Sequence, residues 1–302
     1  MWFKNLKLYR FTQAFELEQN ALQSMMQAMP FRHCSSQEIS SMGFVAPISG
    51  DASDDAQLFH WAGDAVWFRL KREEKILPSS VVNAELAEKV SQIEQETGTP
   101  VGKKVQKEMK EDIIQTMLPR AFAKHGFVNA YISLSEQIMV VDASSDGSAE
   151  VLLACLRKCV GSLPVVPFAK SQQQEVLTSW LLKDAPEGIE LLDEAEFKSP
   201  ADDGGIIRCK HQDLDADEIL AHIQAGKWVQ KIAIQYKERL SCLITEDLSI
   251  KRLKFTDLVI QENEDISKED MHARLDADFT LFVSEIDAFV KDLGAIFALE
   301  ED

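Results

Sequence analysis

The side chains best suited to holding a polyanion are basic residues that gather in short clusters along the chain. The largest cluster runs from Lys103 to Lys124, where six basic residues stand against three acids. Lys103 and Lys107 are four residues apart, and Lys107 and Lys110 are three apart, so a helix would place them on one face. Such a face could bind phosphates. A solvated helix face shows the same pattern and is the commoner case for this stretch taken alone.

A second basic cluster lies in a segment with the composition of a strand, residues 250–255. In a strand, Ile250, Arg252 and Lys254 share one face, and the residues between them share the other. Arg252 and Lys254 together could line a phosphate-binding surface. Charged side chains that protect an edge strand from pairing would give the same pattern.

Patterns typical of catalysis and of metal binding are weak. The glycine-rich stretch 98–104 is one residue too short for a phosphate-binding loop and lacks its hydroxyl residue. Asp276 and Asp278 could hold Mg²⁺ as a pair, but two nearby aspartates are expected by chance in so acidic a segment. No serine stands in a nucleophile motif, and the histidines lack zinc-ligand spacing. We predict that the protein is not an enzyme and binds neither a metal nor a cofactor.

The net charge of −18 argues at first against nucleic acid, because an acidic chain repels phosphate. The acids are concentrated, however. From Asp257 to Asp302, fourteen acids stand against Lys268, Arg274 and Lys291, a net charge of −11. The protein could therefore be acidic outside and basic along one surface. It could equally be an acidic protein-binding module, such as a DNA mimic that binds a repair protein.

The remaining composition predicts a cytoplasmic protein. The sequence has no apolar run long enough to span a membrane and no signal peptide at its start. The five cysteines form no CxxC pair. Cys155 and Cys159 are four residues apart on an expected helix, where we expect both to be buried in the core.

The spacing of apolar residues, with proline and glycine as boundaries, predicts an irregular order of helices and strands. Two helices, from 79 and from 102, are expected to form a helical hairpin inserted between strands, with Ser79 or Ser80 as a cap. We also expect a stiff linker at 163–167 and an acidic helical tail from 257. The other expected helices are 14–28, 148–160, 171–183 and 215–225. The expected strands are 2–11, a hairpin around 63–64, 128–134, 138–141, 188–197, 205–210, 228–236, 239–245 and 250–255. This order predicts an α+β fold.

Several strings, in order along the whole chain, resemble the bacterial recombination-associated RdgC family. They are WFKNL at 2–6, REEKILP at 72–78, LPRAF at 118–122, GSLPVVP at 161–167, LLDEAE at 191–196, DGGIIR at 203–208, KRLKF at 251–255 and DADF at 276–279. Each string is weakly specific alone, but eight in register are a strong signal.

The resemblance implies a ring-shaped homodimer with a basic central hole for duplex DNA, bound without sequence preference. It implies three domains: a central domain of 1–78 and 125–168, a helical tip of 79–124 and a base of 169–302. Double-stranded DNA, and single-stranded DNA as well, would be the partners. The protein would lie on the nucleoid and would inhibit RecA-promoted strand exchange by competing for DNA, with no membrane partner.

The resemblance also assigns roles to particular residues. Phe122 would belong to the contact that closes the ring, and Arg120, Lys103 and Lys104 would face DNA. Lys210 and Gln212 would contact phosphate near the hole. His211 stands where relatives can have a lysine, and a neutral imidazole attracts phosphate less. With Arg252 and Lys254 from the strand pattern, the predicted DNA contacts are Lys103, Lys104, Arg120, Lys210, His211, Gln212, Arg252 and Lys254.

Overall fold

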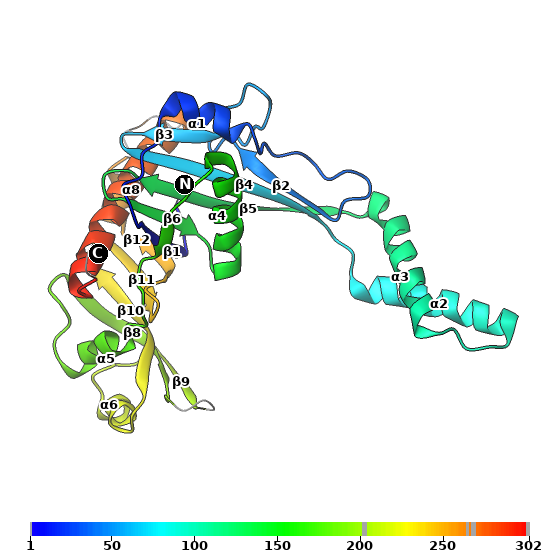
Figure 1. The fold of residues 1–302 in the computed structure, drawn as a ribbon. Coiled ribbons are helices and arrows are strands. Elements are labelled where there is room, and N and C mark those ends of the chain that lie inside the picture. Colours follow the sequence, from blue (N-terminus) through cyan, green and yellow to red (C-terminus); the bar gives the residue numbers. More distant parts are fainter. Residues whose placement is uncertain (1, 201–203, 264–265, 267–269, 300–302) are drawn as a thin grey trace.

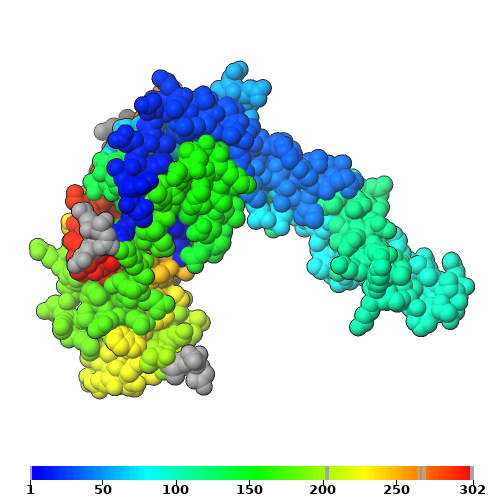
Figure 2. All heavy atoms as spheres, in the orientation of Figure 1, coloured from blue at the N-terminus to red at the C-terminus, as the bar shows by residue number. Residues whose placement is uncertain are grey.

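A computed structural model describes residues 2–200, 204–263, 266 and 270–299. The chain is an open arch (Figure 1). One end is formed by the sheet and the helices that pack on it, and the other is a long arm that ends in two helices. Figure 2 shows that the space between the arm and the opposite end of the chain is open.

A single twelve-stranded sheet runs through the arch, in the order β2-β4-β5-β6-β1-β12-β11-β10-β8-β9, with β3 beside β4 and β7 beside β1. The strands are β1 Leu6–Phe11, β2 Ser40–Val45, β3 Phe59–Ala62, β4 Ala65–Lys75, β5 Ala123–Ser133, β6 Ile138–Asp142, β7 Val165–Pro167, β8 Ile189–Lys198, β9 Ile206–Lys210, β10 Trp228–Tyr236, β11 Leu240–Thr245 and β12 Ile250–Phe255. The helices are α1 Gln19–Met26, α2 Ser79–Thr97, α3 Lys103–Met117, the 3-10 turn η1 Leu118–Arg120, α4 Asp146–Val160, α5 Gln174–Leu182, α6 Asp217–Gln224, α7 Asp257–Gln261 and α8 Met271–Ile296. The predicted α+β class is confirmed.

Two cores hold the sheet, one on each face. Helix α8 packs on one face through residues such as Phe279, Phe282 and Phe289, and its core extends from the middle of the arch to the strands β8–β12. Helices α1 and α4 cover the other face of the first strands only. The corresponding face of β8–β12 carries charged side chains such as Glu194 and Lys210. No helix of the described part of the chain covers this face, which turns towards the hollow of the arch (Figure 1).

The arm is an extension of two strands. All eleven residues of β4 pair with β5, out to Lys75 opposite Ala123, and α2 and α3 follow beyond. Gly98 ends α2 with a φ of +67°, which glycine adopts without strain. Few side chains of these helices are buried, namely Val82, Ile113 and Leu118. The arm is therefore held mainly by its backbone pairing and a small apolar contact.

Several predictions about elements need correction. The acidic segment from 257 is no surface tail, because α8 buries a full apolar face; its residues 264–265, 267–269 and 300–302 lie outside the described residues. The expected linker contains β7, which pairs with β1. The expected helix 14–28 is shortened to α1. Pro78, rather than a serine, stands at the cap position of α2, and no side chain caps that helix.

Candidate nucleic-acid interface

The arm presents basic side chains at the start of α3. Lys103, Lys104 and Lys107 are exposed, and the first turn of the helix contains no acid. Among the residues that the structure describes, the ion pairs of the arm involve Lys89 with Glu85, Arg72 and Lys124 with Glu74, and His125 with Glu73; none involves these three lysines. Cations at a helix N-terminus oppose the helix dipole, at a cost of about 0.3–1 kcal/mol each. Their position thus costs stability and leaves them available to an anion.

Arg120 and Phe122 lie at the other end of α3, about 22 Å away by the rise of a fifteen-residue helix. The intervening turn η1 is anchored by buried Leu118. The backbone of Phe122 is fixed, because its carbonyl accepts a hydrogen bond of 2.7 Å from the Ile76 amide. Its ring is 85% exposed, and Arg120 is exposed as well. Phe122 therefore does not belong to the hydrophobic core of the chain.

At the opposite end of the arch, Lys210 and Arg252 share one acidic partner. Lys210 Nζ lies 3.8 Å from Glu194 Oε1, and Arg252 Nη2 lies 2.8 Å from the same oxygen. Both basic side chains are more than half exposed. Lys254 is exposed on the same strand as Arg252.

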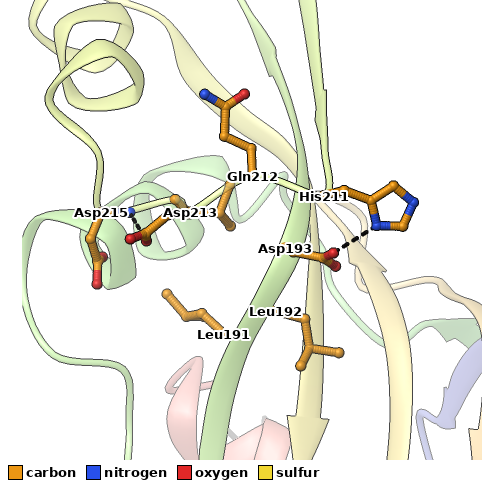
Figure 3. A pocket seen from close by; sticks show the side chains of 8 residues that line it. Leu191, Leu192, Asp193, His211, Gln212, Asp213 and Asp215 are labelled. Atoms are coloured by element: carbon orange, nitrogen blue, oxygen red, sulfur yellow. Dashed lines mark hydrogen bonds and ion pairs between the residues drawn. The ribbon is translucent and has the colours of Figure 1, made fainter.

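His211 and Gln212 also contact acids. Figure 3 shows the His211 ring directed at Asp193, with Nδ1 2.9 Å from Oδ2, while Gln212 points away from it. The Gln212 side-chain amide donates a hydrogen bond to Glu218. These residues line a cavity of about 380 Å³ together with Leu191, Leu192, Asp193, Asp213, Leu214 and Asp215. The cavity is rich in carboxylates, so His211 faces acids as the molecule stands.

The strand β12 departs from the predicted alternation. Ile250 and Leu253, three residues apart, both lie in the core, because a bulge at Arg252 shifts the register between Leu243↔Lys251 and Ser241↔Lys254. Arg252 has a φ of +53°, an uncommon conformation for a residue with a side chain. Arg252 and Lys254 remain exposed, as predicted, but they do not share a face with Ile250.

The paired aspartates have separate partners. Asp276 Oδ1 lies 2.7 Å from His60 Nε2, whereas Asp278 accepts a hydrogen bond of 3.2 Å from the Asn263 side chain. Residues two apart on a helix do not face each other. Within the described ranges, no group of three or more histidine, cysteine and acidic side chains is arranged to hold a metal ion.

The two cysteines of α4 are buried, as predicted, and burial raises the pKa of the Cys159 thiol to about 11. No described helix combines the length and apolar character needed to cross a bilayer.

The acidic partners of the basic residues were not predicted. Asp193 and Glu194 lie in the string LLDEAE, which carried part of the family resemblance but gave no sign of pairing with residues 16 or more positions away. Their role depends on how strands distant in sequence meet, and no local pattern in the sequence shows this.

Comparison with known proteins finds relatives that match along nearly the whole length of the chain. The family model described as "Putative exonuclease, RdgC" matches residues 1–300. The Recombination-associated protein RdgC of Pseudoalteromonas atlantica is 52% identical, and the match covers 100% of this chain and 99% of that protein. The proteins of the same name from Aeromonas hydrophila and Tolumonas auensis are 45% and 44% identical over the same shares. The chain belongs to the RdgC family of recombination-associated proteins.

Proposed function

We propose that two copies of this chain close into a ring that holds duplex DNA through its phosphates, without reading sequence. The observation that carries the proposal is the arm of the arch, where the 85% exposed Phe122 and the exposed Arg120 lie at one end of α3 and three exposed lysines begin the other end. A large exposed aromatic on a fixed backbone is suited to packing against a second subunit. Phe122 is the residue that would close the ring.

The open shape of the arch supports separate roles for its three regions (Figure 2). The central domain, 1–78 and 125–168, would span the ring, the tip, 79–124, would close it, and the base, 169–302, would supply the second contact between subunits. DNA in the hollow would meet Lys103, Lys104 and Arg120 from the arm and Lys210, His211, Gln212, Arg252 and Lys254 from the base. Release of counterions from the phosphates would drive binding.

Ring closure would slow dissociation of DNA and keep other proteins from it. The protein would thereby inhibit RecA-promoted strand exchange by occupying the DNA, in the cytoplasm and on the nucleoid. Single-stranded DNA offers the same phosphates and would bind as well. The recombination-associated names of the relatives agree with this role.

The proposed function is binding without catalysis, although the family model is described as a putative exonuclease. Asp276 and Asp278, the carboxylates most suited by sequence to a nuclease, bond to His60 and Asn263 rather than to a common point. Incubating pure protein with end-labelled DNA and Mg²⁺ or Mn²⁺ should yield no cleavage. Cleavage that Asp276→Ala or Asp278→Ala abolishes would make the protein a nuclease.

The binding proposal is tested by salt. The logarithm of the association constant should fall linearly with the logarithm of the salt concentration, by about 0.9 per phosphate contacted, and equally for duplexes of unrelated sequence. The alternative, an acidic module that binds a repair protein, predicts no such slope. A flat response, or one site bound at least about tenfold more tightly, would refute the phosphate-binding ring.

A further inference from the structure

Two basic residues of the base meet at one carboxylate oxygen. Glu194 Oε1 lies 2.8 Å from Arg252 Nη2 and 3.8 Å from Lys210 Nζ. Lys210 belongs to β9 at the edge of the sheet, whereas Arg252 belongs to β12, with β11, β10 and β8 between them in the strand order. Cations from strands so far apart in the sheet converge on a single point of the uncovered face.

Two bulges bring these side chains together. In β8, Leu191 pairs with Ile234 and Ala195 with Ile232, so three residues, Glu194 among them, stand opposite one residue of β10. In β12, a residue from outside the strand stabilises the bulge at Arg252. The Asn5 side-chain oxygen accepts a hydrogen bond of 3.3 Å from the Arg252 backbone amide. Bulges commonly redirect a side chain beside a functional site.

The charge arrangement matches what a phosphate oxygen requires. A carboxylate oxygen and a phosphodiester oxygen accept the same charge-assisted hydrogen bonds, and guanidinium and ammonium groups donate to both. The side chains of Lys210 and Arg252 are 60% and 52% exposed, so a ligand from solvent can reach both. Glu194 occupies the point where such an oxygen would lie.

A neighbouring cluster shows how a purely structural pair differs. Glu196, two residues along β8, binds Lys231 and Arg208 at 2.7 Å each and is only 16% exposed. Around Glu194, the lysine stands more than an ångström further away. Lys210 is thus held less closely than either cation of the Glu196 cluster and is the more easily transferred to another anion.

We propose that Lys210 and Arg252 form one phosphate-binding seat, and that Glu194 fills this seat until a DNA phosphate displaces it. The seat rests on the proposed function and adds two features to it: the two cations bind a single phosphate, and an acid of the same subunit competes with that phosphate. Glu194 also keeps the two cations together when no DNA is bound.

The first experiment removes the competitor. Glu194→Gln in the full-length protein should bind a duplex of random sequence about two- to fivefold more tightly at moderate salt, the range expected when an exposed ion pair no longer has to be broken. Glu190→Gln is the matched control, since Glu190 is exposed on the same strand and faces Gln235, an uncharged residue. Equal gains in both variants, or weaker binding by Glu194→Gln, would overturn the proposal.

A second experiment leaves Glu194 intact and counts phosphates. Lys210→Gln, Arg252→Gln and the double variant are compared by the salt dependence of duplex binding. If both cations bind one phosphate, the salt slope of the double variant should be smaller than that of the wild type by about 0.9, which is the contribution of a single phosphate. A loss of about 1.8 would mean two separate phosphates and would refute the shared seat.

A variant of the arm distinguishes failure of the shared phosphate seat from failure of the proposed function. Lys103→Ala/Lys104→Ala leaves the base untouched and should weaken DNA binding whether or not the seat exists. If the arm variant weakens binding while Glu194→Gln behaves as its control does, the seat is wrong and the proposed function stands. If the arm variant and the base variants all bind DNA as the wild type does, the proposed function itself fails.

Discussion

The arm and the base present their predicted DNA contacts in opposite ways. On the arm, Lys103 and Lys104 are exposed, and the ion pairs that the structure describes there involve other residues. On the base, Lys210, His211 and Arg252 each lie within 4 Å of a carboxylate. The arm is therefore ready to attract phosphate, whereas these three residues of the base must first exchange one anion for another.

Under the proposed function, the difference would allow a chain with a net charge of −18 to bind a polyanion. An exposed cation without a carboxylate partner attracts a polyanion more than one whose charge is neutralised. Within the part of the chain that the structure describes, Lys103, Lys104 and Lys107 are such cations, and they stand on α3, at the end of the arch away from the acidic α8 (Figure 1). Contacts that form only by exchange add little to the first encounter but hold the DNA in place once it is bound. The predictions below test this contrast, from the largest expected effect to the smallest.

The largest effect should come from Phe122→Ser. Because the ring of Phe122 is 85% exposed, the subunit should keep its fold and its melting temperature, and the base should keep it dimeric. Loss of the aromatic contact at the tip should weaken duplex binding at least about tenfold and abolish inhibition of RecA.

Leu182→Ser is the control, since Leu182 is 57% exposed but lies on α5 of the base. It should bind DNA as the wild type does. A much lower melting temperature for Phe122→Ser would show that the residue supports its own subunit. Normal folding with wild-type affinity would show that closure at the tip does not hold DNA.

The next largest effect should be on the salt dependence of DNA binding. Lys103→Ala/Lys104→Ala should reduce the salt slope of binding by about two, since each lysine is available to its own phosphate, and Arg120→Ala should reduce it by about one. Lys210→Ala should change it by less than one, because Arg252 would keep the shared phosphate. The arm variant should also be slightly more stable than the wild type, since it removes two cations from a helix N-terminus, where they oppose the helix dipole. A larger loss from Lys210→Ala than from the arm pair would reverse the contrast.

The smallest effect concerns the stability of the helix that supports the base. Asp287 on α8 is half-buried, and this loss of solvation raises its pKa to about 6; its carboxylate accepts a hydrogen bond of 2.8 Å from Tyr131. A carboxyl with a raised pKa binds its proton more tightly in the folded than in the unfolded chain, so stability falls as pH rises from about 4 to about 6.

Asp287→Asn cannot ionise and should stabilise the protein at pH 8 by about 1–3 kcal/mol, but much less at pH 5. Calorimetric melting at the two pH values checks this, and DNA binding by the arm should not change. A stabilisation of the same size at both pH values would contradict the ionisation account.

Elements set by local signals were predictable from sequence. The helical hairpin of the arm follows from apolar spacing and from Gly98, and the structure places α2 and α3 within a residue or so of the expected bounds. The packing of α8 was missed although its signal was present, because Phe279, Phe282, Ile286 and Phe289 recur at helical spacing among many acids. The high density of acidic residues in this segment obscured an amphipathic helix.

The site was predictable only in part, for a physical reason. Exposure of Lys103, Arg120 and Phe122 follows from short segments that stand clear of the cores. The pairing of Arg252 with Glu194 depends on two bulges and on the curvature of a sheet whose strands are far apart in sequence. No periodicity within a single strand could show that a residue from β8 would reach one from β12.

The central claim is that a closed ring holds DNA through its phosphates, and DNA topology tests it most directly. Protein bound to a relaxed circular duplex and to the same duplex made linear is challenged with salt and excess competitor DNA. The account predicts slow release from the circle and faster release from the linear form, which has ends to slide from, with Phe122→Ser releasing both alike. Equal release rates for circular and linear DNA with the wild-type protein would contradict it.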